Sequence, residues 1–257
     1  MVVNMTVTFE VRGRVAIITL NRPEARNAVS QELAEDIEAA IDRLESDTNL
    51  WIGILCGNGP SFCAGADLKA IASGSARLST ERGGFAGLVR RTRTKPLIAA
   101  VEGPAVAGGT EIVLSCDLVV ASSVARFGLP EVKRSLVANA GGLFRLPRAL
   151  PQNVAMELAL TGEDLSAESA HLHGLVNRLV EPGQALDTAL ELAEVINANA
   201  PLAVRASRRV VLAAHLLEDD DAFGLTAEAI RELTGTADFR EGPKAFVEKR
   251  APRWTGC

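Results

Sequence analysis

Two glycine-rich segments contain the residues best suited to chemistry. Residues 61–69 (SFCAGADLK) and 102–111 (EGPAVAGGTE) each follow a short apolar run and lead into a helical pattern. Small residues let a ligand approach the backbone, and the first N–H groups of a helix favour negative charge. If the two segments face each other, they can form an oxyanion hole, in which each donor contributes on the order of 10²–10³ in rate. Taken singly, each segment also fits an ordinary tight turn before a capped helix.

Two glutamates are candidates for acid–base chemistry, one at the end of the second segment and one further along the chain. Glu111 falls in the first turn of a helix predicted over 110–116, and Glu131 follows residues 127–130 (FGLP) in a loop. The two carboxylates flank a short predicted strand, so they could converge on one water molecule. Such a pair divides general acid and general base work when its environments separate the two pKa values. A purely structural role for Glu111, stabilised by the helix dipole, is the alternative.

Composition and missing motifs exclude several other classes. The formal net charge of −5 disfavours a nucleic-acid surface, and four scattered cysteines without a CxxC pair indicate a reducing compartment. Zinc-protease, serine-hydrolase, P-loop and dinucleotide-binding motifs are absent from the sequence. His171 and His173 are two residues apart, which makes a poor metal pair, so no metal is expected. Without a long apolar stretch or a targeting leader, we expect a cytoplasmic protein with no membrane partner.

The order of predicted elements favours a layered α/β fold. Ser30 is predicted to cap a helix whose apolar face carries Leu33, Ile37, Ile41 and Leu44. Short apolar runs that alternate with helical patterns predict buried strands. The strands are predicted over 15–20, 51–56, 97–101, 118–121 and 175–180, and residues 73–84 are predicted to form a loop.

The chain changes character beyond about residue 184, where the predicted strands stop. Helices are predicted over 185–199, 202–217, 222–233 and 241–249. We therefore expect an α/β core over residues 1–197 and a helical region over 198–257. The helical region has too little apolar sequence to form its own core, so we expect it to pack on the α/β core or on a neighbouring subunit.

Several motifs in this order resemble the enoyl-CoA hydratase (crotonase) superfamily, and the resemblance covers nearly the whole chain. The motifs are residues 62–69 (FCAGADLK), 107–111 (AGGTE), 127–131 (FGLPE) and 140–142 (AGG), supported by 21–27 (NRPEARN) and 241–250 (EGPKAFVEKR). Residues 129–134 (LPEVKR), together with 144–147 (FRLP), are also similar to the carnitinyl-CoA dehydratase branch.

The resemblance implies a fold and an assembly. Such proteins are spirals of ββα units with a C-terminal helical region that covers the active site or mediates trimerisation, and they form homotrimers or dimers of trimers. By position, Ala66 and Gly108 match the residues whose N–H groups bind the thioester oxygen. Glu111 and Glu131 match the two carboxylates of the hydratases.

The resemblance also implies the substrate and its contacts. The partner is an acyl-CoA thioester, and no separate cofactor is expected because coenzyme A is part of the substrate. One departure from the family is Asn139, which stands in a position where many hydratases carry a small residue; its amide is expected to affect the acyl group accepted. The residues expected to bind substrate or coenzyme A are Arg26, Ala64, Ala66, Asp67, Leu68, Lys69 and Asn139.

The leading hypothesis is therefore an enoyl-CoA hydratase, a hydro-lyase that adds water to the 2,3 double bond. An enoyl-CoA isomerase or a carnitinyl-CoA-type dehydratase would use the same oxyanion hole. A non-catalytic or RNA-binding relative is the remaining alternative, but such charge runs are more often solvated helix faces, subunit contacts or contacts to coenzyme A phosphates. The runs in question are Arg90, Arg91, Arg93 and Lys95, and then Arg205, Arg208 and Arg209.

Overall fold

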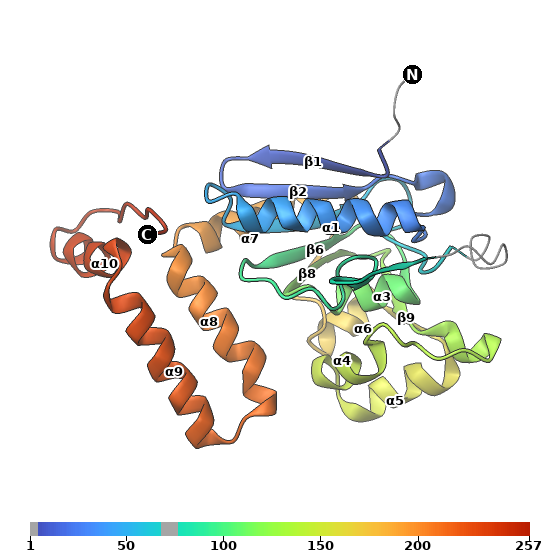
Figure 1. Ribbon diagram of the computed structural model, residues 1–257. Helices are drawn as coiled ribbons and strands as arrows, with labels where there is room; N and C mark the ends of the chain where they lie inside the picture. The colour runs from blue at the N-terminus through green and yellow to red at the C-terminus, as the bar shows by residue number, and fades with distance from the viewer. Residues whose placement is uncertain (1–4, 68–76) are drawn as a thin grey trace.

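The computed structural model describes residues 5–67 and 77–257. A twisted sheet forms the centre of the fold, with helices packed on both of its faces (Figure 1). A smaller sheet and several short helices lie below it in that view, and three C-terminal helices extend to one side.

The central sheet has six strands in the order β1-β2-β3-β6-β8-β11. β1 and β2 form an antiparallel hairpin, and every later pair in the sheet is parallel. β1 stands at one end of this order and β11 at the other. The strands are β1 (Val7–Arg12), β2 (Val15–Leu20), β3 (Ile52–Gly57), β6 (Leu97–Val101), β8 (Leu118–Ser122) and β11 (Arg178–Val180).

Both faces of the sheet are buried at β2, β3, β6 and β8, which explains why these strands are continuous apolar runs rather than alternating ones. Ile17, Ile54 and Ile98 lie in one cluster with the alanines of helix α7 (Ala185–Asn197). Their neighbours along the strands point the other way, because successive side chains alternate between the faces of a sheet. Ile18 and Leu55 accordingly join the larger cluster that contains helix α1 (Gln31–Ser46).

Short strands and helices complete the core. A three-stranded sheet has the order β10-β9-β7, and β4 pairs with β5. None of the helices in residues 5–67 and 77–257 has the length and hydrophobicity to cross a membrane. The remaining elements are η1 (Pro23–Ala25), β4 (Ser79–Thr80), β5 (Gly84–Phe85), β7 (Ala105–Val106), α3 (Gly108–Val113), β9 (Arg126–Gly128), η2 (Pro130–Arg134), α4 (Gly142–Ala149), α5 (Gln152–Thr161), β10 (Asp164–Ser166) and α6 (Ala167–Leu172).

The predicted start of α1 is confirmed. The Ser30 hydroxyl accepts a hydrogen bond from the Leu33 N–H at 3.2 Å, which satisfies one of the unpaired donors of the first turn. The predicted apolar face is buried along its whole length. Four of the predicted strands also lie within a residue of β2, β3, β6 and β8.

The strand predicted over 175–180 is half as long as expected. Leu175 and Val176 donate their N–H groups to the carbonyl of Ala170 at the end of α6, so they are not available to pair with β8. Pairing begins only at Arg178. The helix predicted over 110–116 also differs, since α3 starts at Gly108 and ends at Val113. The predicted loop 73–84 lies partly outside the described residues, and its last part forms β4 and the start of β5.

The interpretation of residues 90–95 as a solvated helix face is wrong. The segment is not helical, and Arg93 and Lys95 are buried, at 7% and 2% exposure. The Lys95 ammonium donates to the carbonyls of Leu44 and Asp47, both at 2.6 Å, and so caps the C-terminal end of α1. These charges hold elements of the fold together instead of forming a basic surface.

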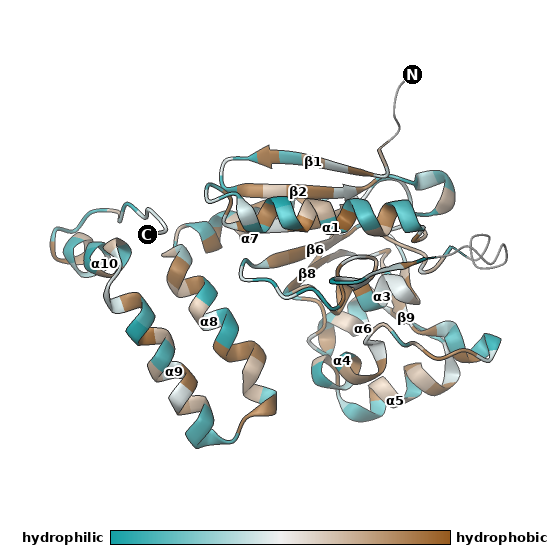
Figure 2. Ribbon diagram, viewed as in Figure 1, coloured by the Kyte–Doolittle hydropathy of each residue, from teal (hydrophilic) through white to brown (hydrophobic). Residues whose placement is uncertain are grey.

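The C-terminal helices form an arm beside the core. They are α8 (Pro201–Ala213), the short η3 (Ala214–Leu216), α9 (Asp219–Thr234) and α10 (Ala237–Val247). Residues 198–200 connect α7 to α8. Apolar and polar residues alternate along α8 and α9 (Figure 2). The predicted helix limits 202–217, 222–233 and 241–249 differ from these elements by a few residues, as is usual for helix ends.

An ionic cluster fastens this arm to the core. Asp117 accepts from Arg93 at 3.2 Å and pairs with Arg208 of α8 at 2.9 Å. The same carboxylate accepts the N–H of Leu97 at 2.8 Å, at the start of β6. One acidic side chain therefore joins the central sheet, the 90–95 segment and the helical arm.

We expect Asp117→Ala to lower the free energy of unfolding by about 3 kcal/mol, because it leaves the Arg93 guanidinium buried without its counter-charge. The measurement is the urea midpoint at fixed protein concentration. Glu163→Ala is the control, since Glu163 is 72% exposed in its pair with Lys133 and its loss should cost less than about 1 kcal/mol. Equal midpoints for the two variants would contradict the role given to Asp117.

Candidate active site

The two glycine-rich segments lie against each other. They follow β3 and β6, which are adjacent and parallel, with Cys56 opposite Ala100. Both segments therefore start at the carboxyl ends of these strands. Beyond these ends Cys63 forms a parallel bridge with Ala105, and the Val106 N–H donates to the Cys63 carbonyl at 3.0 Å.

Glycine is required where the segments touch. Gly65 has φ +88°, and a Cβ atom there would come within 2.8 Å of the Ala107 Cβ and 3.0 Å of the Gly108 nitrogen. A side chain at Gly65 would therefore force the two segments apart. The predicted convergence of the segments is what the structure shows.

The main-chain N–H groups of Ala66 and Gly108 are available at this junction. On either side of Ala66, the Gly65 carbonyl accepts from Val29 and the Asp67 N–H donates to Val29. Those bonds occupy one edge of the segment, so the Ala66 N–H points away from Val29. Gly108 is the first residue of α3. Across residues 5–67 and 77–257, neither N–H donates to another protein group.

Thr110 fixes the start of α3. Its buried hydroxyl lies 2.7 Å from the carbonyl oxygen of Ala105 in β7 and accepts the N–H of Gly128 in β9 at 2.9 Å. Ala107, just before the helix, adopts φ +53°, a conformation that is strained for a residue with a side chain. Its N–H donates to the Gly128 carbonyl at 2.8 Å, which holds it there. The small sheet thus positions Gly108.

Glu111 is buried in the first turn of α3, with 3% of the residue exposed. Its Oε1 accepts the N–H groups of Ala140 at 2.7 Å and Gly142 at 2.9 Å. Burial raises the pKa of this carboxyl, and the nearby charge of Glu131 raises it further. The two N–H groups and the Arg145 guanidinium oppose that rise. The glycines of the 140–142 motif therefore serve to bring backbone donors to Glu111.

Glu131 lies in η2, directly after β9 and Pro130. Burial raises the pKa of its carboxyl, and a hydrogen bond from its own backbone N–H and the charge of Arg134 oppose this effect. Its Oε2 is buried and accepts no hydrogen bond from the described residues. A buried acceptor without a partner costs about 1–3 kcal/mol, so this oxygen is suited to a water molecule, a ligand or a proton of its own.

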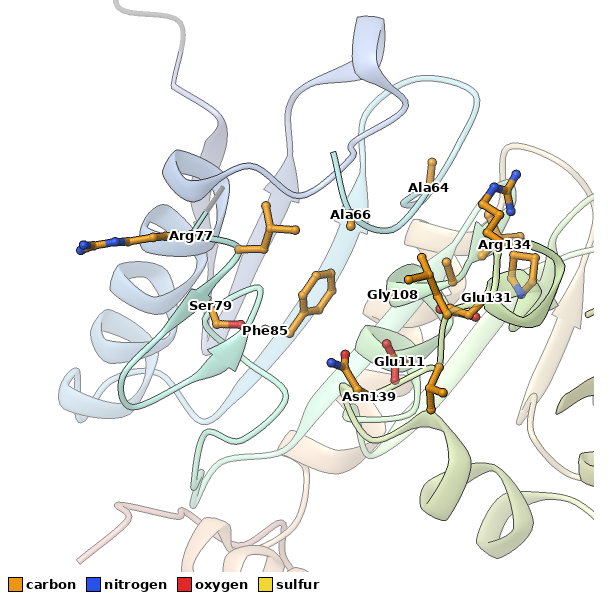
Figure 3. A pocket seen from close by; sticks show the side chains of 16 residues that line it. Ala64, Ala66, Arg77, Ser79, Phe85, Gly108, Glu111, Glu131, Arg134 and Asn139 are labelled. Carbon is orange, nitrogen blue, oxygen red and sulfur yellow. The ribbon is translucent and has the colours of Figure 1, made fainter. Parts of the chain in front are cut away.

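One cavity joins these groups. It has a volume of about 670 Å³ and is lined by Ala64, Ala66, Gly108, Glu111, Glu131 and Asn139, among others. Figure 3 shows Glu111 between Glu131 and Asn139 on one wall, with Ala66 and Phe85 across from them. Two N–H groups without an acceptor in the described part of the chain, together with two carboxylates around one space, can stabilise an oxyanion and move protons.

The remaining predicted residues lie beside this cavity or outside the described residues. Arg26 and Asp67 line a neighbouring hollow of about 710 Å³, which shares Ala64 and Ala66 with the cavity. Asp67 forms an ion pair with Arg22 at 3.0 Å. Leu68 and Lys69, also predicted to bind the ligand, lie outside the described residues.

Sequence reasoning missed Phe85 as a site residue. Its ring lies where a side chain at Gly108 would be, since a Cβ there would meet two ring carbons at 2.5 Å. Phe85 belongs to the two-residue strand β5, which is too short to produce a periodic signal. Arg134, Leu136 and Val137 line the same cavity. In the described ranges no cluster of three His, Cys, Asp or Glu residues could hold a metal ion.

Comparison with known proteins gives consistent matches over nearly the whole chain. A family model described as Enoyl-CoA hydratase/isomerase matches residues 10–257. Enoyl-CoA hydratase EchA19 of Mycobacterium tuberculosis is 43% identical over 95% of this chain and 94% of its own. Carnitinyl-CoA dehydratase of Proteus mirabilis is 38% identical over 95% and 96%. A crystal structure of an enoyl-CoA hydratase from M. tuberculosis H37Rv is 50% identical, with a TM-score of 0.95 over 98% and 100% of the two chains.

The raised pKa of Glu131 predicts a pH-dependent cost to stability. A carboxyl whose pKa is higher in the folded state binds its proton more tightly there, so stability falls as the pH rises through the window above the unfolded pKa. Glu131→Gln should therefore raise the melting temperature more at pH 7 than at pH 4. Glu157→Gln, an exposed position on α5, is the control. A melting-temperature difference that does not grow between pH 4 and pH 7 would contradict the prediction.

Proposed function

Because the chain belongs to the enoyl-CoA hydratase/isomerase family, we propose that it adds water across the 2,3 double bond of a 2-enoyl-CoA thioester with the residues of this cavity. The predicted family and the crotonase-type α/β fold are both confirmed by the comparisons. The observation that carries the proposal is the cavity itself, where two carboxylates lie near two backbone N–H groups that have no acceptor among the described residues.

The N–H groups of Ala66 and Gly108 bind the thioester oxygen. Addition of a water oxygen to C3 moves an electron pair from the double bond into the thioester, which becomes an enolate with negative charge on that oxygen. Preformed donors lower the barrier because they stabilise this charge more than the neutral carbonyl. The contact between Gly65 and the 107–108 backbone supports a rigid arrangement.

Glu111 acts as the base and Glu131 as the acid. Glu111 is held as an acceptor by two N–H groups and faces the Arg145 guanidinium, which favours the carboxylate form. It takes a proton from the water as the water oxygen bonds to C3. Glu131 is half-buried, and its buried Oε2 accepts no hydrogen bond from the described residues, which favours the protonated form. It helps to position the water and gives its proton to C2, so the enolate collapses to the 3-hydroxyacyl thioester.

The hollow beside the cavity suits the coenzyme A portion. Ala64 and Ala66 line both spaces, so a thioester at the two N–H groups would have its coenzyme A part next to Arg26. The place of Asn139 in the cavity lining supports its predicted effect on the acyl group. The contacts of Leu68 and Lys69, the division at residue 197 and a location in the cytoplasm remain predictions.

The direct test is a spectrophotometric panel of enoyl-CoA thioesters. Loss of the conjugated absorbance indicates hydration, whereas a gain from 3-enoyl or 3-hydroxyacyl thioesters indicates isomerisation or dehydration. Glu111→Gln and Glu131→Gln should each lower kcat by about 10²–10⁴, because each removes one proton-transfer group. Glu157→Gln should leave kcat unchanged. If Glu131→Gln keeps kcat within about threefold of wild type, the assignment of roles is wrong.

We also propose a homotrimer or a dimer of trimers. Large apolar side chains are exposed along the helical arm: Leu216 at 71%, Phe223 at 74%, Phe246 at 85% and Val247 at 79%. Large apolar side chains exposed in this number on one region of the fold favour burial against another chain. Light scattering should give a mass three or six times the 27.1 kDa of one chain. A monomeric mass at micromolar concentration would overturn this proposal.

A further inference from the structure

Arg145 joins the two walls of the cavity without lining it. It lies in the first turn of α4, and its guanidinium is half-buried. One guanidinium nitrogen, Nη2, donates to the carbonyl of Val89 at 2.6 Å. The other, Nη1, donates to the carbonyl of Ala140 at 3.3 Å. These two carbonyls belong to different sides of the site.

On one side is the turn that holds Glu111. Ala140 and Gly142 supply the two N–H groups that contact Oε1 of Glu111. Gly141 between them has φ +109°, and a Cβ atom there would lie 2.3 Å from Nη1 of Arg145. The guanidinium therefore packs directly against the bend that aims both N–H groups at the carboxylate.

On the other side is the turn that carries Phe85. The Val89 carbonyl belongs to residues 85–89, in which the N–H groups of Leu88 and Val89 both donate to the Phe85 carbonyl, at 3.2 and 3.3 Å. The Phe85 ring packs where a side chain at Gly108 would be. Arg145 thus connects the wall beside Gly108 with the wall that orients Glu111.

The positive charge of Arg145, like its hydrogen bonds, supports Glu111 in the role of a base. Glu111 faces the like charge of Glu131 and the opposite charge of Arg145. Arg145 in turn faces Glu111, the cations Arg93 and Arg148, and the thiol of Cys116. An opposite charge close to a buried carboxyl favours the ionised form, which is the form a base needs.

We propose that Arg145 is a positioning residue for the reaction, whose guanidinium ties the turn that orients Glu111 to the turn that carries Phe85. The inference rests on the proposed function, because it assigns Arg145 a role in holding the general base of that reaction. It extends the site to a residue that touches neither the substrate nor the reacting atoms.

The test is Arg145→Gln, compared with Arg148→Gln. Arg148 lies on the same helix, is exposed, and contacts the same Phe144 ring, with its guanidinium 5.4 Å from the ring centre against 5.2 Å for Arg145. We expect Arg145→Gln to lower kcat about 10- to 100-fold with KM changed less than about threefold, because the base is displaced while the coenzyme A contacts are kept. Arg148→Gln should leave both constants close to wild type.

The pH dependence of kcat/KM distinguishes a positioning role of Arg145 from a general loss of protein stability. Loss of the cation should move the acidic limb of kcat/KM to higher pH by about half a unit or more, because Glu111 becomes harder to ionise. If Arg145→Gln does not fold, Arg145→Lys tests the proposal instead. Lysine keeps the charge but lacks the two donor nitrogens of the guanidinium, so the acidic limb should stay in place while kcat falls at least about fivefold.

The outcomes are distinct. A wild-type protein that hydrates no enoyl thioester overturns the proposed function and this inference together. An active wild type with a folded Arg145→Gln variant that keeps both its kcat and its acidic limb overturns the role of Arg145 alone. If Arg145→Gln does not fold, an Arg145→Lys variant with the kcat of wild type also overturns the role of Arg145.

Discussion

The site depends on the close approach of two backbone segments. β3 and β6 deliver residues 61–67 and 102–108 from one edge of the sheet, and contact between the segments is possible only because Gly65 has no side chain. This contact brings the N–H groups of Ala66 and Gly108 to one cavity. Thr110, Phe85 and the small sheet then keep the second segment in place. The donors are set by the fold before any substrate arrives, which is the condition under which they lower a barrier.

The two glutamates lie in one cavity but differ in the groups that contact their carboxyls. Burial raises the pKa of both Glu111 and Glu131. Glu111 accepts two backbone N–H groups and faces a guanidinium, whereas the buried Oε2 of Glu131 accepts no hydrogen bond from the described residues. The glycines at positions 141 and 142 contribute to this difference, because they let the backbone reach Oε1 of Glu111.

The sequence predicted the parts of the fold that have strong local signals. The buried strands and the capped helix α1 are long enough to show periodicity, and the ordered motifs identified the cavity residues. β5, β7 and β9 are two or three residues long, so Phe85 gave no signal. The burial of Arg93 and Lys95 depends on partners far along the chain, such as Asp117 and the end of α1. A single sequence does not reveal such pairings.

The outer strand of the sheet has a consequence for solubility. β1 ends the strand order, so one of its edges has no neighbouring strand among residues 5–67 and 77–257, and such an edge is a template for aggregation. Glu10 and Arg12 form an ion pair on this strand, and their side chains are 57% and 50% exposed. Docking of a foreign strand would have to strip water from both charges. Accretion along the sheet is thereby discouraged, which leaves the exposed apolar side chains of the helical arm as the surface for the proposed association.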